Sequence, residues 1–413
     1  MPPARSSPLL ADARVLAAAG AALREGLGDR RATCELRFLR PPPDYGFLLM
    51  AGVEDAAQAL ESELPGDDEL RAARAAVAGI EPLLDRLAAG PLRVDLDAAL
   101  DGSVVFGDEP VVSVEGRYAD VLVALMLVRG RVERATAAAT RAARCVLAAN
   151  GKPVVDGASA RLGELGADLV ARAAYVGGVS ATTALGPGLR HGLPVRASDG
   201  PPAAPSASGS LRPPSSDDWG GGALDQLVEL GPGGDSDATI LALRQRWTSL
   251  GGFLVHDLDA PSLLSARVDL VALEQEGAWS PRLGAAFDPL VEPGRKLVVR
   301  YLDARSMPVA DVLHMASERI QPASSALMVG ALGVAAPVPV GAARGVPLTT
   351  ALLRGGRRVG PPDPLTEARQ RALAALQGLP DSLLLLRHPS PYPVGLSPKL
   401  AAQKGDLLAA LPR

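Results

Sequence analysis

Between residues 152 and 273 the chain alternates short apolar segments with segments of helical periodicity, and this alternation limits the possible folds more than any other feature. The apolar segments predict strands at residues 152–157, 193–198, 227–230, 253–257 and 268–273. Helices are predicted between them, at residues 164–175, 188–191 and 237–250. Strands that alternate with helices form parallel βα units, so the sequence predicts an α/β fold with a parallel sheet.

The first 150 residues predict an α+β arrangement instead. Apolar segments at residues 35–38 and 45–52 predict strands on either side of a proline-rich turn. Residues 104–106 and 111–114 flank a Gly-Asp-Glu-Pro turn and predict a β-hairpin or a corner. Residues 119–150 predict a long helical region with a break near Gly130.

A stretch rich in Pro, Ser, Gly and Ala interrupts the alternation at residues 199–222. It has no hydrophobic period, and such a composition cannot bury enough apolar surface to order itself. The stretch is therefore expected to be a disordered loop. Because the alternation resumes after it, we expect the loop to lie inside a domain and not between two domains.

Composition restricts the partners and the compartment. The 413 residues are 47% hydrophobic, which is enough for one large core or two moderate ones. The net charge of −4 and the lack of a basic stripe argue against a nucleic acid or an anionic membrane as partner. Cys34 and Cys145 are far apart in the sequence and the four histidines show no metal-ligand spacing. These features predict reduced thiols in a cytoplasmic protein and assign no metal ligand.

Several short motifs follow one another in an order that is found in one enzyme family. Gly102-Ser-Val-Val-Phe106, followed by Pro110-Val-Val-Ser-Val-Glu-Gly116, resembles the entry to the barrel of nicotinate phosphoribosyltransferases. The chain then matches the T-x-A-A-R helix, the D/E-x-G-x-R-R-A-x-G loop and the G-G-x-x-x-T-S-N turn of that family, at residues 140–144, 156–163 and 173–183. Weaker matches at residues 9–16, 293–296 and 392–400 extend the resemblance over nearly the whole chain.

The resemblance implies a fold and a division into domains. It implies an irregular α/β barrel joined to an α+β sandwich, with the barrel either closed differently or left open because two strands are missing. Residues 1–115 would form the N-terminal α+β block, and residues 116–284 the barrel-like domain with the loop 199–222. Residues 285–413 would pack back on the N-terminal block.

The resemblance also implies a reaction, in which phosphoribose passes from phosphoribosyl pyrophosphate to nicotinate and gives the mononucleotide used in NAD synthesis. Such a reaction needs Mg²⁺ and cations for the pyrophosphate, and carboxylates for the ribose and the developing positive centre. Sites of this family are built at a dimer interface. We therefore expect a homodimer or a heterodimer with a homologue.

The family's site residues can be carried over one by one. The motif match gives a catalytic role to Asp235, which follows Pro232-Gly-Gly where the family has D-S-G-D. Substrate or phosphate binding is assigned to eight further residues, which are Arg144, Asp156, Arg161, Gly177, Gly178, Thr182, Thr183 and Ser198.

Structural roles compete with these assignments. The two glycines and two threonines could form a phosphate-binding turn or only a tight turn that caps a helix. The two aspartates could hold ribose or Mg²⁺, or they could cap helices. The arginine at position 144 could reach phosphate or pair with a neighbouring acid.

Several family residues are replaced. The position of the ring-stacking tyrosine holds Arg14, and the position of the phosphorylated histidine holds Pro201, so coupling to ATP is not expected. Ser159 and Ala160 stand where the family has paired arginines, with Arg161 one place further on. The segment 255–259, Val-His-Asp-Leu-Asp, resembles the family's S-G-D/N-L-D, but the G-x-G-T loop that should follow is missing.

Two functions follow from this mixture. The first is a phosphoribosyltransferase that acts on nicotinate without ATP coupling. The second is a non-catalytic paralogue that binds a nucleotide-like ligand or pairs with an active homologue, which the loss of charged residues favours because each missing contact weakens transition-state binding.

Overall fold

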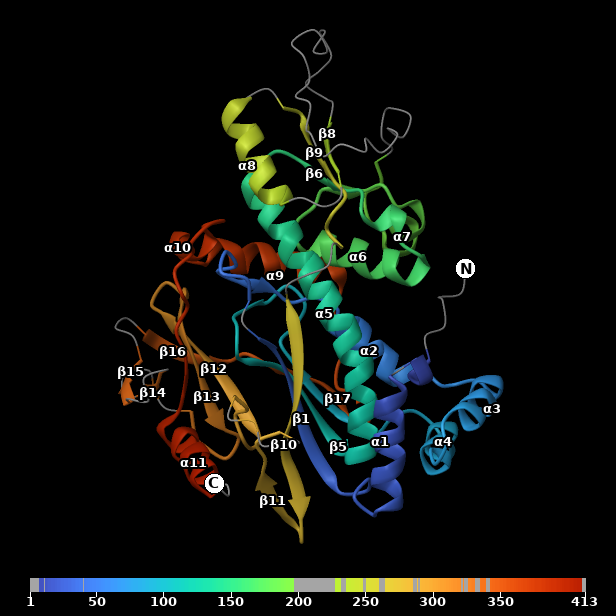
Figure 1. Ribbon diagram of the computed structural model, residues 1–413. Coiled ribbons are helices and arrows are strands. Elements are labelled where there is room, and N and C mark those ends of the chain that lie inside the picture. Colours follow the sequence, from blue (N-terminus) through green and yellow to red (C-terminus); the bar gives the residue numbers. More distant parts are fainter. Residues whose placement is uncertain are drawn as a thin grey trace.

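The computed structural model describes residues 7–10, 12–39, 41–196, 227–231, 235–247, 250–259, 264–284, 288, 290–320, 322, 326–330, 335–338 and 342–410. The predicted loop 199–222 and the candidate residue Ser198 lie outside these ranges. The described residues form a mixed α/β protein with several sheets (Figure 1).

A seven-stranded antiparallel sheet gathers segments from distant parts of the chain. Its strand order is β11 (Ala278–Pro281), β10 (Ser265–Gln275), β1 (Arg31–Leu39), β5 (Pro110–Arg117), β3 (Asp95–Ala98), β17 (Thr350–Arg354) and β18 (Arg357–Arg358). The sequence places residues 265–281 with the barrel-like domain, but here β10 pairs with β1 and β11 pairs with β10. Helix α1 (Ala13–Arg24) lies along the sheet beside the first half of α5 (Tyr118–Ala149) (Figure 1).

The predicted hairpin at residues 104–114 is a corner. Strand β4 (Val104–Val105) pairs with β2 (Leu48–Leu49), whereas β5 pairs with β1 and β3 in the larger sheet. The turn between β4 and β5 therefore carries the chain from one sheet to another. Glu109 stabilises this turn, because its Oε1 accepts the Phe106 N–H at 2.8 Å.

Helix α5 runs without a break past Gly130, so the predicted interruption is wrong. Its N-terminal half packs into the core of the seven-stranded sheet, and its C-terminal half packs into a second core around the parallel strands. A glycine inside a helix costs only about 1 kcal/mol relative to alanine. Burial of a face on two cores outweighs that cost.

A four-stranded parallel sheet confirms the βα units that the alternation predicts. Its order is β7 (Ala181–Thr182), β6 (Val154–Asp156), β9 (Gly252–Val255) and β8 (Leu227–Leu230), and every neighbouring pair is parallel. Val195, in the segment predicted as a strand at residues 193–198, adds one parallel bridge to Thr182. Helices α6 (Glu164–Val176) and α8 (Ser236–Arg246) pack against α5 beside this sheet (Figure 1).

A six-stranded sheet is formed mainly by residues that the sequence left without predicted strands. Its order is β15 (Ala335–Pro337), β14 (Leu327–Val329), β19 (Val394–Leu396), β13 (Pro308–Met315), β12 (Lys296–Asp303) and β16 (Ala342–Pro347). Two helices of the C-terminal part are α9 (Leu365–Gln377) and α11 (Pro398–Ala409). Helix α11 packs on β13, β14 and β19.

The remaining helices are short. They are η1 (Pro8–Leu10), α2 (Val53–Ser62), α3 (Asp67–Ala76), α4 (Glu81–Ala88), η2 (Ser159–Arg161), α7 (Leu185–His191) and α10 (Asp381–Leu384). Within the described ranges, every helix is too short or too polar to cross a membrane.

Candidate functional site

The four parallel strands end at one edge of their sheet, and ligands of open α/β sheets bind outside the carboxyl ends of the strands. Residues 156–159, 182–183 and 256–257 lie at or directly after three of these ends, and residues 235–236 lie at the start of α8, the helix that follows β8. We call this set the carboxyl edge. Three of its buried side-chain atoms have no hydrogen-bond partner within the described residues: Ser159 Oγ, His256 Nδ1 and Asp257 Oδ2.

Asp257 is the most informative member of the carboxyl edge. It is 1% exposed, and its Oδ1 accepts the Ser236 hydroxyl at 2.6 Å while Oδ2 stays without a partner. Burial raises the pKa of the Asp257 carboxyl above its usual value, against the opposing effects of the Ser236 hydrogen bond and the Arg141 charge. A buried acceptor without a donor costs about 1–3 kcal/mol, so this oxygen is suited to a ligand hydroxyl or a cation.

His256 lies beside the loop that follows β6. Its Nε2 is 2.6 Å from Glu229 Oε1 on β8. A Cβ atom at Gly157 would lie 2.5 Å from the His256 ring, so a glycine is required where the loop passes the histidine. The ring therefore fills the space between the loop and the ends of β8 and β9.

Asp156, Thr182 and Thr183 are brought together, but by bonds within the chain. Asp156 is completely buried, and its carboxylate accepts the N–H groups of Ala158 (2.9 Å) and Ser159 (3.1 Å) and the hydroxyl of Thr182 (2.8 Å). The Thr183 N–H donates to the Asp156 carbonyl oxygen at 2.9 Å. These bonds tie the end of β6 to the end of β7, which favours the capping interpretation over ribose binding.

Gly177 and Gly178 follow α6 and precede β7. Their N–H groups donate to Ala173 and Tyr175 carbonyl oxygens, so they are occupied by the helix end. A Cβ at Gly177 would lie 2.4 Å from the Ala139 carbonyl oxygen of α5, and Gly178 has a φ of +101°. Close packing at Gly177 and the positive φ at Gly178 thus explain why both positions hold glycine. This favours the tight turn over a phosphate-binding turn.

Arg144 is buried and links four parts of the chain. Its Nε donates to Asp237 on α8 (2.8 Å), one terminal nitrogen donates to the Leu386 carbonyl oxygen (2.9 Å), and the other donates to the Asp44 carbonyl oxygen. The guanidinium also lies 4.3 Å from the centroid of the Tyr45 ring. This is the pairing with a neighbouring acid that the sequence left open as the alternative to phosphate binding.

Arg161 and Asp235 are the two predicted site residues that stay open to a ligand. Arg161 is exposed in η2 and its side chain has no bond within the described residues. Asp235 is exposed at the start of α8, and its carboxylate makes no capping hydrogen bond. The N-cap alternative for Asp235 is therefore not formed by its side chain.

Sequence reasoning did not assign a role to Asp257 or Ser236. The Val-His-Asp-Leu-Asp resemblance pointed to the segment, but only burial and the unpartnered oxygen single out Asp257. No group of three or more His, Cys, Asp or Glu side chains among the described residues is placed to hold a metal ion by itself.

Comparisons with known proteins find similar sequences for parts of the chain and a similar fold for nearly all of it. Residues 295–404 match the family described as nicotinate phosphoribosyltransferase C-terminal domain. Nicotinate phosphoribosyltransferase pncB1 of Mycobacterium tuberculosis is 33% identical over 45% of this chain, and nicotinate phosphoribosyltransferase of Bacillus subtilis is 29% identical over 42%. The matched regions span 41% and 35% of those relatives' own lengths.

The fold is similar over nearly the whole chain to that of human nicotinic acid phosphoribosyltransferase. That crystal structure superposes with a TM-score of 0.78 at 20% identity, covering 97% of this chain and 100% of the human chain. The nicotinate-nucleotide pyrophosphorylase of Pyrococcus furiosus superposes with a TM-score of 0.59 at 16% identity over 89% of this chain and 94% of that chain. The motif order, these sequence matches and the shared fold make the chain similar to nicotinate phosphoribosyltransferases.

Proposed function

We propose that the carboxyl edge binds phosphoribosyl pyrophosphate and nicotinate and transfers phosphoribose to the nicotinate nitrogen, giving nicotinate mononucleotide. One observation carries this proposal, namely the three buried polar atoms without partners at Ser159, His256 and Asp257. Buried polar groups are nearly always hydrogen-bonded, so three exceptions close together are suited to meet a bound ligand, ion or water. The similarity to nicotinate phosphoribosyltransferases supplies the reaction class.

The free groups of the edge match the charges of this reaction. The exposed Arg161 is placed on the loop after β6, where a cation can bind phosphate. Asp257 and Asp235 are carboxylates that can hold ribose hydroxyls and stabilise positive charge at the ribose carbon. Asp235 precedes Ser236, whose hydroxyl donates to Asp257, so the two carboxylates lie on neighbouring segments of the edge.

Mg²⁺ fits this donor set as a substrate-bound ion. Magnesium is usually held by substrate phosphates, waters and one or two carboxylates, so a cluster of three protein ligands is not required. The unpartnered Asp257 Oδ2 is the protein oxygen that would hold it. The ion would neutralise the leaving pyrophosphate, and coupling to ATP is not expected because proline occupies position 201.

We infer further that the parallel strands are part of an irregular, open barrel. Within the described residues, β8 pairs only with β9, and beyond β7 there is only the single bridge at Val195. The division at residues 115 and 284, the sandwich of the N- and C-terminal parts, the dimer and the cytoplasmic location stay predictions of the same kind.

The transferase proposal is tested by mononucleotide formation. Purified protein is incubated with nicotinate, phosphoribosyl pyrophosphate and Mg²⁺, with and without ATP, and the product is measured by chromatography. We expect product without ATP and a loss of about 10²–10³-fold in Asp257→Asn, the usual effect of removing one preorganised polar contact. Asp406→Asn, an equal change at an exposed position on α11, should leave the rate unchanged.

Binding without turnover is the second candidate, favoured by one observation. The side chains of Asp156 and Arg144 are hydrogen-bonded to other residues of the chain. Arg14, at the position of the ring-stacking tyrosine, forms an ion pair with Asp12 at 2.7 Å. Calorimetric binding of phosphoribosyl pyrophosphate that is lost in Asp257→Asn, with no product formed by the native chain, would establish this candidate. Absence of both binding and product would refute a role for the carboxyl edge.

A further inference from the structure

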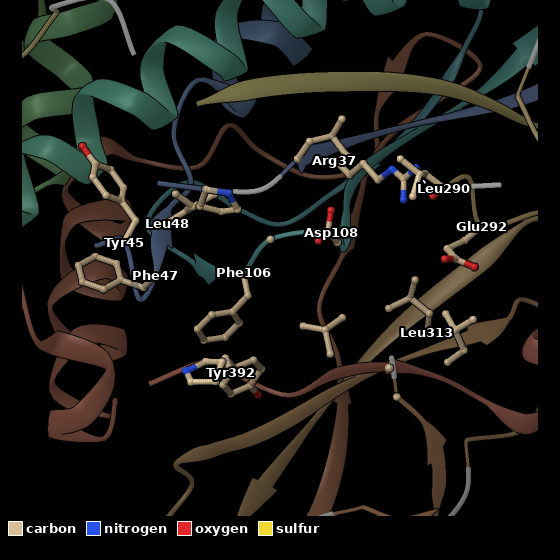
Figure 2. Close-up of a pocket in the computed structure, with 18 of the residues that line it drawn as sticks. Arg37, Tyr45, Phe47, Leu48, Phe106, Asp108, Leu290, Glu292, Leu313 and Tyr392 are labelled. Carbon is tan, nitrogen blue, oxygen red and sulfur yellow. Dashed lines mark hydrogen bonds between the residues drawn. The ribbon is translucent and has the colours of Figure 1, made fainter. Parts of the chain in front are cut away.

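A second cavity, of about 1150 Å³, lies away from the carboxyl edge (Figure 2). Its walls come from β1 of the seven-stranded sheet, from β13, β14 and β19 of the six-stranded sheet, and from α11. None of its described lining residues belongs to β6, β7, β8 or β9. A cavity of this size exceeds the ~300–1,000 Å³ of typical small-molecule sites, so it can hold a sizeable organic molecule.

One wall of the cavity is a rigid aromatic surface. The rings of Phe106 and Tyr392 stack with centroids 3.5 Å apart and planes 12° apart, and Tyr45 and Phe47 lie further along the same cavity (Figure 2). The Tyr392 hydroxyl donates to Asp311 at 3.0 Å, which holds the pair in place. Phe106 is buried and the Arg300 guanidinium lies 5.2 Å from its ring centroid, so the half-buried Tyr392 ring is the part of this wall that an aromatic or apolar ligand body can contact.

The charged end of the cavity is lined, among the described residues, by two cations, Arg37 and Lys404, and by two carboxylates, Asp108 and Glu292. Both cations are paired, Lys404 with Glu292 and Arg37 with Asp269, a carboxylate outside the lining that Arg267 also contacts. Asp108 lines the same end, is exposed, and has no side-chain bond or ion pair within the described residues. The charge left unmatched is therefore negative.

Asp108 lies in a turn with a left-handed backbone conformation. Its φ is +67°, in the left-handed region that costs a side-chain-bearing residue energy. Aspartate and asparagine adopt this region more readily than other residues with side chains, so the turn accepts either. Figure 2 shows Asp108 between Phe106 and Arg37, at the junction of the aromatic wall and the charged end.

We propose that this cavity binds an amphipathic organic cation, in which an amine or guanidinium group pairs with Asp108 and an aromatic or broad apolar body lies on the Phe106–Tyr392 wall. Arg37 and Lys404 do not repel such a ligand strongly, because each is already paired. An organic anion has no free cation to meet among the described residues of this end. The proposal is independent of the transferase reaction.

The test compares two fluorescent probes that share one body, 1-pyrenemethylammonium and 1-pyreneacetate, titrated against the full chain. We expect the amine to bind at least about tenfold more tightly than the acid, which corresponds to about 1.4 kcal/mol. Asp108→Asn keeps the left-handed turn and should abolish this preference by weakening amine binding alone. Asp406→Asn is the matched control and should bind both probes like the native chain.

Two results would overturn the proposal. One is equal binding, or no binding, of the two probes by the native chain. The other is a preference for the amine that persists in Asp108→Asn when circular dichroism shows that the variant is folded. This test measures no mononucleotide. Its failure therefore does not contradict the transferase proposal, and failure of the transferase assay does not contradict this one.

Discussion

Substitution of Arg144 tests whether this residue stabilises the fold or binds substrate, the role that the motif match assigns to it. Arg144→Ala removes an ion pair to Asp237 with an N···O distance of 2.6 Å, two hydrogen bonds to carbonyl oxygens and the contact with the Tyr45 ring. The side chains of the pair are 6% and 14% exposed, so Asp237 would keep a largely buried charge without a partner. Breaking such a pair costs about 3–5 kcal/mol.

The assay is urea unfolding followed by circular dichroism. We expect the free energy of unfolding of Arg144→Ala to fall by about 3–5 kcal/mol. In Arg144→Ala/Asp237→Asn the unpaired carboxylate is gone, so the double variant should lose less than the sum of the two single variants, by roughly 0.5–3 kcal/mol. Arg161→Ala, at an exposed arginine without a bonded side chain, should stay within about 0.5 kcal/mol of the native chain.

The reasoning is refuted if Arg144→Ala loses less than about 1 kcal/mol of unfolding free energy, the size expected for an exposed ion pair. A stable Arg144→Ala chain that no longer binds phosphoribosyl pyrophosphate would support the phosphate role instead. Additive single and double variants would show that Asp237 does not depend on Arg144.

Two further stability predictions follow from buried groups. Burial and the neighbouring Asp311 raise the pKa of the Glu109 carboxyl well above its usual value. A carboxyl whose pKa is raised in the folded state stabilises the fold at acid pH, and this stability is lost as the pH rises through that pKa. The stability of Glu109→Gln relative to the native chain should therefore be higher at pH 8 than at pH 5. An equal difference in melting temperature at both pH values would contradict this. Gly177→Ala should lower the free energy of unfolding by about 1–3 kcal/mol, because its Cβ would lie 2.4 Å from the Ala139 carbonyl oxygen. Gly130→Ala, whose Cβ would meet nothing within 4 Å, should raise it by up to about 1 kcal/mol. An unchanged free energy of unfolding in Gly177→Ala would show that α5 and α6 can separate.

Local elements of this fold were predictable where the pattern is local. The strands near residues 152–157, 227–230 and 253–257 are present and parallel, because their apolar runs and intervening helices are read from short windows. The prediction of a break at Gly130 was wrong, because the low helix propensity of one glycine costs less than burial of α5 in two cores contributes.

Pairing between distant segments was not predictable. Strand β10 was expected, but its pairing with β1, as in Leu36 opposite Val268, depends on contacts across more than half of the chain. The six-stranded sheet was missed because several of its strands are short and two of them are largely exposed. Such strands lack the alternation of buried and exposed residues that identifies a strand.

The candidate site shows the same division between residue type and residue environment. The motif match named Asp156 and Arg144, yet both are occupied by their neighbours. Motif matching names a residue type at a position, whereas availability to a ligand depends on partners that lie far away in the sequence. Asp257 was passed over because burial and a missing partner are visible only in three dimensions.

The residues that match family motifs therefore fall into two groups, according to whether their polar atoms are hydrogen-bonded within the chain or are available to a ligand. Positions whose polar atoms are fully used, such as Asp156, contribute stability and lose the capacity to bind substrate. Asp257 is the opposite case, because a buried oxygen without a donor destabilises the fold by about 1–3 kcal/mol unless a ligand meets it. If that cost is tied to function, substrate should lower it, and the native chain should gain more thermal stability from phosphoribosyl pyrophosphate with Mg²⁺ than Asp257→Asn does.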